Sequence, residues 1–499
     1  MTGKVYLVGA GPGDIGLLTL KAVEYLKKAQ TIVYDALVNP EILLFANKDA
    51  EKFYVGKKAG KHTLPQSEIN QLLIDKAKEG KIVVRLKGGD PFIFGRGGEE
   101  AEFLADKEIE FEIVPGISSG LAVPAYAGIP LTHREYTSTL TILTGHEDII
   151  KTKSSLPWQK IAELGGTIVI LMGISNLAKI VNELVNNGLN SQTPIAVIRR
   201  GTLSEQETVT GTLSDIVEKA DGIDPPAVIV IGQVVNLRQK LNWFEKKPLF
   251  GKRILVTRTR EQASELTKLL KEYGASVVEF PMIKIVPPLN FKELDRAIGQ
   301  IDTYDWLIFT STNGVKFFFN RLKEIGKDIR ELKGIKIAAI GPETKKMLEN
   351  LGLNVDFQPE LEFTQEGLIV GFKKIGAKRV LIPRSAQARQ VLIEGLKQLG
   401  AEVDEVPAYR TIKEEIDEVH LKGLLSHKAI DIITFTSSST VTNFCSLFKK
   451  EERHSLLNRV KIACIGPITA KKAQDIGLNI DITANEYTIK GLVEAIKNE

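Results

Sequence analysis

Short apolar runs alternate with longer amphipathic stretches along the whole chain. Residues 5–8 and 32–34 are continuous apolar runs, whereas the stretch between them places its apolar residues on one helical face. Similar runs recur at residues 168–171, 195–198 and 228–231. Alternation of strands with helices predicts an α/β fold with parallel sheets.

The pattern also divides the chain into two halves. A polar, proline-containing segment at residues 240–252 separates them. The second half repeats itself at a separation of about 125 residues, which is too long for a solenoid unit. The repeated pairs are residues 251–258 and 377–384, 307–311 and 433–437, and 337–342 and 462–467. This repeat predicts two similar α/β domains, in which the first strand–helix unit of one repeat can complete the sheet of the other.

Composition narrows the class of protein further. The 499 residues are 43% hydrophobic and 26% charged, as in globular proteins of about three or four domains. There are only two cysteines, Cys445 and Cys464, so we expect no disulfide framework and a cytoplasmic protein without a signal peptide. The net charge of +4 comes with no basic block and no run long enough for a membrane helix, which argues against nucleic-acid or membrane partners.

The segment at residues 85–99 carries the strongest local signal. It follows the apolar run at residues 82–84 and contains five glycines within eleven residues. Glycines clustered after a strand let the backbone approach a ligand closely and adopt positive φ angles. We therefore expect a ligand-binding loop here.

A second glycine turn, at residues 9–16, leaves two interpretations open. Gly11, Gly13 and Gly16 form the G-x-G-x-x-G pattern of a dinucleotide site, and Asp35 ends the next strand. Pro12 removes a backbone donor from this turn, and Asp14 would repel a phosphate. These two residues favour a ligand other than a pyrophosphate.

Several motifs of the first half, taken in order, resemble the uroporphyrinogen-III C-methyltransferases among the tetrapyrrole methylases. They are residues 8–14, 55–60, 88–99, 114–119 and 128–134. The resemblance covers residues 1–245, with subdomains at 1–132 and 133–245. It implies that S-adenosylmethionine binds between two α/β domains, and that uroporphyrinogen III is methylated twice to give precorrin-2 for sirohaem or cobalamin.

The resemblance also implies roles for individual residues. The positions implied for cofactor binding are Pro12, Gly88, Gly89, Asp90, Ile93, Ser118, Ser119, Met172, Gly201 and Ala227. Asp35 matches the position of a catalytic base and Lys57 that of an acid. His133 and Arg134 are candidates for holding substrate carboxylates. The resemblance implies no metal, and it implies a homodimer formed through this half.

The second half resembles uroporphyrinogen-III synthase over residues 251–499. The motifs are residues 309–314, 340–344, 407–411, 435–438 and 465–469. The resemblance implies one domain from residues 251–286 with 412–499 and another from 287–411. It further implies that hydroxymethylbilane is cyclised with inversion of its last pyrrole, and that Tyr409 assists the departure of the hydroxyl group. Thr310, Ser311, Ser437 and Ser438 are candidate substrate ligands, because hydroxyls and backbone N–H groups after strands suit carboxylates.

The sequence therefore predicts a tetrapyrrole-methylase fold of two α/β domains, followed by a two-domain α/β fold like that of uroporphyrinogen-III synthase. The predicted function is bifunctional tetrapyrrole biosynthesis. Two alternatives remain: a nicotinamide-dependent oxidoreductase built on Gly11, Gly13, Gly16 and Asp35, and a small-molecule binding module in the repeated half.

Overall fold

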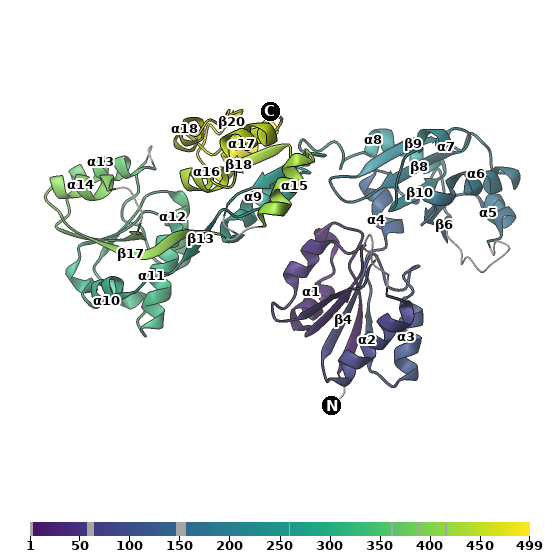
Figure 1. The fold of residues 1–499 in the computed structure, drawn as a ribbon, viewed down its shortest axis with the longest axis horizontal. Helices are drawn as coiled ribbons and strands as arrows, with labels where there is room; N and C mark the ends of the chain where they lie inside the picture. Colours follow the sequence, from purple (N-terminus) through teal and green to yellow (C-terminus); the bar gives the residue numbers. More distant parts are fainter. Residues whose placement is uncertain are drawn as a thin grey trace. The chain divides into compact units, whose positions relative to one another are not determined.

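The computed structural model divides into two compact units (Figure 1). Unit 1 is Met1–Arg253 with Leu270–Ser276, and unit 2 is Ile254–Leu269 with Val277–Glu499. The structure describes residues 3–56, 64–145, 156–258, 260–360, 363–386, 390–414 and 417–499. Within these ranges, no helix combines the length and the apolar character needed to cross a membrane.

The first sheet of unit 1 is parallel throughout, in the order β3-β2-β4-β1-β5. Its strands are β1 (Lys4–Gly9), β2 (Thr31–Tyr34), β3 (Glu51–Tyr54), β4 (Ile82–Lys87) and β5 (Phe111–Val114). On β4, Val83 packs in a core with α2 (Gln66–Lys78) and α3 (Gly97–Asp106), whereas Val84 packs in a core with α1 (Leu20–Lys28). Helices on both faces explain why these strands are continuous apolar runs.

The second sheet of unit 1 is mixed rather than parallel, in the order β6-β7-β10-β8-β9. Its strands are β6 (Leu140–Thr144), β7 (Thr167–Leu171), β8 (Pro194–Arg199), β9 (Glu207–Thr212) and β10 (Ala227–Ile231). Only β6 and β7 run parallel, while β10 is antiparallel to both of its neighbours. Our expectation of a parallel sheet is wrong here, because a strand buried on both faces has the same apolar pattern in either direction.

Within the described residues, five α-helices accompany the second sheet. They are α4 (Ser119–Tyr126), α5 (Trp158–Leu164), α6 (Leu177–Asn186), α7 (Ile216–Lys219) and α8 (Arg238–Leu241). Val123 of α4 packs in one core with Leu171 at the end of β7 and Ile198 of β8. The helix that follows the last strand of the first sheet is thus bound to the second sheet, and it brings the loops of the two sheets together.

The third sheet, almost all of it in unit 2, joins strands from both ends of the second half in the order β12-β11-β18-β19-β20. They are β11 (Arg253–Val256), β12 (Ser276–Glu279), β18 (Ile432–Phe435), β19 (Lys461–Cys464) and β20 (Ile482–Thr483). The accompanying helices are α9 (Arg260–Glu272), α15 (Glu418–Ser426), α16 (Ser438–Cys445), α17 (Lys450–Leu457), α18 (Pro467–Asp475) and α19 (Ile489–Lys497).

The fourth sheet contains the middle of the second half, in the order β13-β17-β16-β14-β15. Its strands are β13 (Ile283–Val286), β14 (Trp306–Phe309), β15 (Lys336–Ala339), β16 (Arg379–Ser385) and β17 (Glu402–Lys413). The helices are α10 (Lys292–Gly299), α11 (Thr312–Glu324), α12 (Pro342–Asn350), α13 (Gln365–Ile375) and α14 (Val391–Gln398).

The internal repeat appears as equivalent strands in these two sheets. The order β11-β18-β19 in one corresponds to β16-β14-β15 in the other, and all of these pairs are parallel. An aspartate-to-backbone hydrogen bond is repeated as well. The Ile337 backbone N–H donates to Asp356 Oδ2, and the Ile462 N–H donates to Asp481 Oδ2, each at 2.7 Å. Similar sequences have therefore folded into similar sheets whose strands meet in the same order.

Candidate functional site

Three glycine turns meet at the carboxyl edge of the first sheet, where parallel α/β folds place their ligands. A Cβ atom added to Gly9 would lie 2.5 Å from the Gly116 Cα, and one on Gly116 would lie 2.3 Å from the Gly89 carbonyl oxygen. Gly11 and Gly89 exchange two backbone hydrogen bonds, of 2.8 and 3.1 Å, with both residues at positive φ. The loops after β1, β4 and β5 thus pack backbone against backbone, which no residue with a side chain permits.

Asp90 holds two of these loops together. Its Oδ1 accepts a hydrogen bond from the Phe92 backbone N–H at 2.8 Å, and its Oδ2 accepts one from the Gly116 N–H at 2.9 Å. Both oxygens are therefore used by the backbone. Because hydrogen bonds to a charged acceptor are the stronger ones, this carboxylate fixes the shape of the glycine loop.

Asp14 links the first sheet to the second. Its backbone N–H donates to Thr202 Oγ1 at 3.1 Å, and its Oδ2 accepts from the Tyr126 hydroxyl at 2.7 Å. Burial and this carboxylate both raise the pKa of Tyr126, so the hydroxyl remains a donor. The two contacts join the turn after β1 to the end of α4 and to the loop after β8.

The remaining residues predicted to bind the cofactor lie on these loops or at the facing edge of the second sheet. Pro12 is half-buried, Ile93 is exposed, and Ser118 is buried at the N-cap of α4, where its Oγ accepts from the Gly120 N–H at 3.3 Å. Gly88 precedes Gly89, and Ser119 begins α4. Met172 follows β7, Gly201 follows β8 and Ala227 begins β10, which places all three at one edge because β10 is antiparallel to β7 and β8.

Asp35, the predicted base, follows β2 at the same carboxyl edge. Its Oδ1 accepts from the Leu37 backbone N–H at 3.2 Å, and its Oδ2 lies 3.4 Å from the Arg85 guanidinium. Lys57, the predicted acid, lies outside the described residues. His133 and Arg134 occupy a turn between α4 and β6, where His133 pairs with Thr137 and Arg134 is exposed. The described contacts of His133 are made within that turn.

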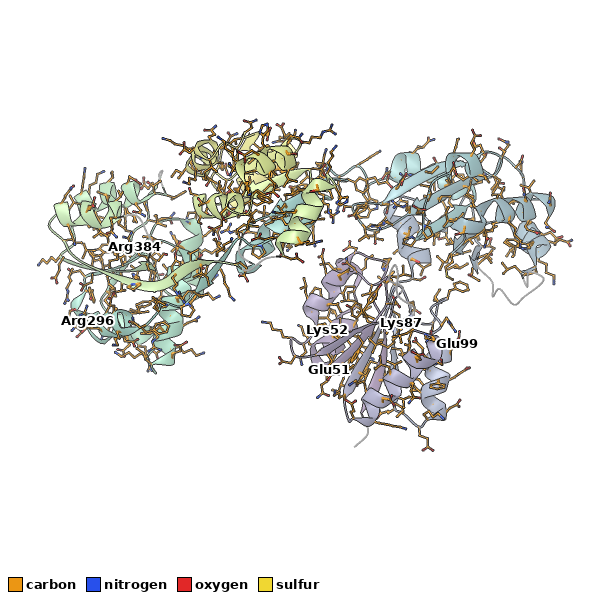
Figure 2. The ribbon with its side chains drawn as sticks, viewed as in Figure 1. Glu51, Lys52, Lys87, Glu99, Arg296 and Arg384 are labelled. Carbon is orange, nitrogen blue, oxygen red and sulfur yellow. The ribbon has the colours of Figure 1, made fainter. Side chains whose placement is uncertain are left out.

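Sequence reasoning missed a buried charged cluster behind these loops. Arg85 and Lys87 of β4 both contact the Oε1 of Glu100, a fully buried residue of α3. Burial lowers the pKa of Lys87, as does the neighbouring Arg85 cation, while Glu100 opposes the shift. Figure 2 labels Lys87 within this domain. Two basic residues inside an otherwise apolar strand were the signal that could have revealed the cluster.

In unit 2, equivalent loops follow β14 and β18. Ser311 caps α11 by accepting from the Gly314 N–H at 3.1 Å, and Ser437 caps α16 by accepting from the Thr440 N–H at 3.3 Å. Thr310 precedes Ser311, and Ser438 is the first residue of α16. Both helix N-termini therefore point at the carboxyl edges of their sheets, where backbone N–H groups attract anions.

Tyr409 of β17 and Ser311 are in direct contact, with their hydroxyl oxygens 3.0 Å apart. Tyr409 is buried, and burial raises the pKa of its hydroxyl although Ser311 and Arg384 act in the opposite direction. Arg384, which lies in β16 and is labelled in Figure 2, is fully buried and pairs with Glu405 at 2.7 Å. The repeat offered a signal for this arginine, since Arg258 occupies the matching position.

Two exposed aromatic side chains also occupy equivalent places in the repeat. Phe363 lies against Gly341, which caps α12, and Tyr487 lies against Gly466, which caps α18. They are 48% and 66% exposed, although large aromatic rings are usually buried. The sequence motifs predict a role for neither residue.

Comparison with known proteins matches each half to a family. The profile of Tetrapyrrole (Corrin/Porphyrin) Methylases matches residues 4–217, and that of Uroporphyrinogen-III synthase HemD matches residues 264–494. The porphyrin biosynthesis protein HemD of Ruminiclostridium josui is 41% identical over 500 residues, covering 99% of this chain and 97% of that protein.

Two further relatives share the first half or more. The uroporphyrinogen-III C-methyltransferase of Bacillus subtilis is 43% identical over 373 residues, covering 74% of this chain and 75% of that protein. The S-adenosyl-L-methionine-dependent uroporphyrinogen III methyltransferase of Methanosarcina barkeri is 56% identical over 241 residues, covering 48% of this chain and 94% of that protein. These matches give no support to the oxidoreductase alternative. The chain belongs to a family of bifunctional tetrapyrrole biosynthesis proteins, in which a tetrapyrrole methylase is followed by a uroporphyrinogen-III synthase.

Proposed function

We propose that the second half of this chain cyclises hydroxymethylbilane to uroporphyrinogen III, and that the first half methylates this product twice with S-adenosylmethionine to give precorrin-2. The observation that carries the proposal is the 41% identity to one relative across both halves. The two reactions are consecutive, because the product of the ring closure is the substrate of the methylation.

The carboxyl edge of the first sheet fits S-adenosylmethionine. Gly89 is half-buried and presents backbone at positive φ, and a Cβ on it would project over the N-terminus of α4, 3.7 Å from the Ser119 nitrogen. A side-chain-free surface beside a helix N-terminus suits an adenosyl group that carries an amino-acid carboxylate. Residues on the loops after β1, β4 and β5, together with Met172, Gly201 and Ala227, would hold it.

For the methylation, the main tasks of the protein are to position the two reactants and to transfer a proton. When bound, S-adenosylmethionine supplies an electrophilic methyl group on a sulfonium ion. Asp90 holds the loop that orients the reactants, which is where much of the rate enhancement originates. Because the methyl group arrives from a cation, the tetrapyrrole must release a proton, and Asp35 is the residue we assign to accept it. We assign Lys57 as the acid, and His133 and Arg134 as partners of substrate carboxylates.

The ring closure uses the loops of unit 2. A phenol is protonated at neutral pH, and burial raises the pKa of Tyr409 further, so its hydroxyl is available as a donor to the departing hydroxyl group of hydroxymethylbilane. The Ser311 hydroxyl lies 3.0 Å from the Tyr409 hydroxyl and orients it. Thr310, Ser437 and Ser438, with the N-termini of α11 and α16, suit the carboxylates of a linear tetrapyrrole.

The proposal extends to organisation and partners. We assign the methylase to residues 1–245 and the synthase to residues 251–499, with the subdomain limits given above. We further propose a homodimer formed through this half, as the resemblance to the methylases implies. We infer no nucleic-acid or membrane partner and a cytoplasmic location. Light scattering of the intact chain tests the dimer, which a monomeric mass would rule out.

Product analysis tests the two activities together. Hydroxymethylbilane alone should give uroporphyrinogen III. Adding S-adenosylmethionine should raise the product mass by two CH2 units, because each methyl group that is added replaces a proton. Ring closure to the isomer without the inverted pyrrole would refute the synthase assignment. Calorimetric titration tests the methylase assignment separately. Binding of NAD without binding of S-adenosylhomocysteine would refute it and would favour the oxidoreductase alternative.

A further inference from the structure

Four charged side chains, of which all but Asp35 are buried, form one network behind the glycine loop. Arg85 and Lys87 lie two residues apart on β4 and so face the same side of the sheet. Glu100 Oε1 accepts from Arg85 Nε at 3.1 Å and from Lys87 Nζ at 2.9 Å. Arg85 Nη2 reaches Asp35 Oδ2 at 3.4 Å. Two cations and two carboxylates therefore balance one another, and Asp35 is the most exposed of the four.

One arm of the network closes the glycine loop. Lys87 is the last residue of β4, and Glu100 lies in the first turn of α3, so their ion pair spans residues 88–99. Gln66 of α2 donates to the same oxygen of Glu100 at 3.0 Å. Both ends of the loop are thus tied to one buried carboxylate, and charge-assisted hydrogen bonds are strong in a buried environment.

The other arm reaches the predicted base. Arg85 Nη1 lies near the carbonyl oxygens of Val33, at 3.4 Å, and of Leu86, at 3.2 Å. The guanidinium is planar and rigid, so anchoring its Nε on Glu100 and its Nη1 on the backbone determines where Nη2 points. Its Nη2 points at Asp35.

We propose that Glu100 is a positioning residue that sets the cofactor loop through Lys87 and the proton-accepting carboxylate of Asp35 through Arg85. This inference rests on the proposed methylase function. Buried ion pairs contribute little to stability compared with apolar packing, so the network is not explained by stability alone. Its arrangement instead connects one buried carboxylate, that of Glu100, to both parts of the site that must be aligned, which are the cofactor loop and Asp35.

Three variants of the full chain separate the arms. Arg85→Lys keeps the charge but loses the fork that reaches Asp35, so kcat for methylation should fall about 10- to 100-fold while the affinity for S-adenosylhomocysteine stays within about twofold. Lys87→Gln should instead weaken the binding of S-adenosylhomocysteine about tenfold. Glu100→Gln should change both quantities. The matched control is Glu51→Gln, which breaks an exposed 2.9 Å pair with Lys81 at the opposite edge of the same sheet and should change neither.

Calorimetric titration and steady-state kinetics give the two readouts. An unchanged kcat in Arg85→Lys, or unchanged affinity in Lys87→Gln, would overturn the proposal and leave a structural ion cluster. Full activity of Asp35→Asn would refute the base and the Arg85 arm while leaving the Lys87 arm standing. If the native chain does not bind S-adenosylhomocysteine at all, the proposed methylase function itself fails.

A measurement on the native protein tests the proposal even where the variants do not fold. Hydrogen exchange should slow at residues 88–99 and at residues 33–37 together when S-adenosylhomocysteine binds, because the network ties the two segments to one carboxylate. Protection of residues 88–99 alone would contradict the proposed link to Asp35.

Discussion

Asp90 and Gly116 are joined by a hydrogen bond of 2.9 Å from the backbone N–H of Gly116 to Oδ2 of Asp90. The bond links the loop after β4 to the loop after β5, and the second oxygen of Asp90 holds the Phe92 N–H within its own loop. The carboxylate therefore acts on the shape of the glycine site through the backbone.

Replacing Asp90 should abolish methylation without affecting ring closure. Asp90→Ala removes two hydrogen bonds to a charged acceptor, each worth about 1.5–3 kcal/mol, so the affinity for S-adenosylhomocysteine should fall at least about tenfold. Cyclisation of hydroxymethylbilane should proceed at the native rate, since Tyr409 and its neighbours belong to unit 2. Asp106→Asn, an exposed position on α3, is the control. Loss of both activities in a folded Asp90→Ala protein would contradict two separate sites.

Tyr409→Phe tests the ring-closing half. Without its hydroxyl the side chain cannot donate a proton, so cyclisation should slow about 100-fold, as for loss of a general acid. Methylation of added uroporphyrinogen III should be unchanged. Tyr304→Phe is the matched control, because Tyr304 is another buried tyrosine of this unit, just before β14, and its hydroxyl donates to Asp404 at 2.6 Å. A native cyclisation rate in Tyr409→Phe would remove Tyr409 from the mechanism.

The two equivalent aromatic residues should contribute to binding of the tetrapyrrole. Phe363 and Tyr487 lie beside the capping glycines of α12 and α18, where they can stack on pyrrole rings. Phe363→Ala and Tyr487→Ala should each raise KM for hydroxymethylbilane up to about tenfold, with kcat and thermal stability nearly native because the side chains are exposed. Leu289→Ala, an exposed apolar position of the same unit, should leave KM unchanged. Equal effects of all three substitutions would exclude specific stacking.

The two buried cysteines make the second half sensitive to alkaline pH. Burial raises the pKa of Cys464 from 9.0 to about 12, and it raises that of Cys445 in the same direction. The neutral thiol is thus favoured in the folded state, so its contribution to stability is complete below pH 9 and is lost as the pH rises toward 12.

Thiol titration checks this expectation. At pH 8 the folded protein should react slowly with an aromatic disulfide reagent, and denaturation should release two reactive thiols per chain. Cys464→Ala should show a smaller loss of unfolding free energy between pH 9 and 12 than the native chain. Rapid reaction of both thiols at pH 8 in the folded protein would contradict their burial.

Local pattern accounted for much of the architecture. The apolar run at residues 82–84 became β4, and the glycine segment after it became the loop that meets Gly9 and Gly116. The repeated segments became strands in equivalent positions of two sheets. The family and the bifunctional role followed from the same motifs, and the comparisons confirm both.

The direction of the strands in the second sheet and the partners of the buried charges were not available from the sequence. Periodicity records which residues are buried, but it does not record which distant segment covers them. β10 has the apolar pattern of a parallel strand yet runs antiparallel to β7 and β8. In the sequence, Glu100 looks like any polar residue near the start of a helix. Its ion pair with Lys87 forms only because α3 packs against β4.

The sequence by itself determined the α/β class, the two halves, the repeat and the glycine turns, because each depends on residues close together in the chain. Only the tertiary structure decided that Glu100 meets Lys87 and Arg85, that Arg85 reaches Asp35, and that Tyr409 meets Ser311. These contacts depend on how strands and helices from separate segments pack, and a buried charge is tolerated only where that packing provides its partner.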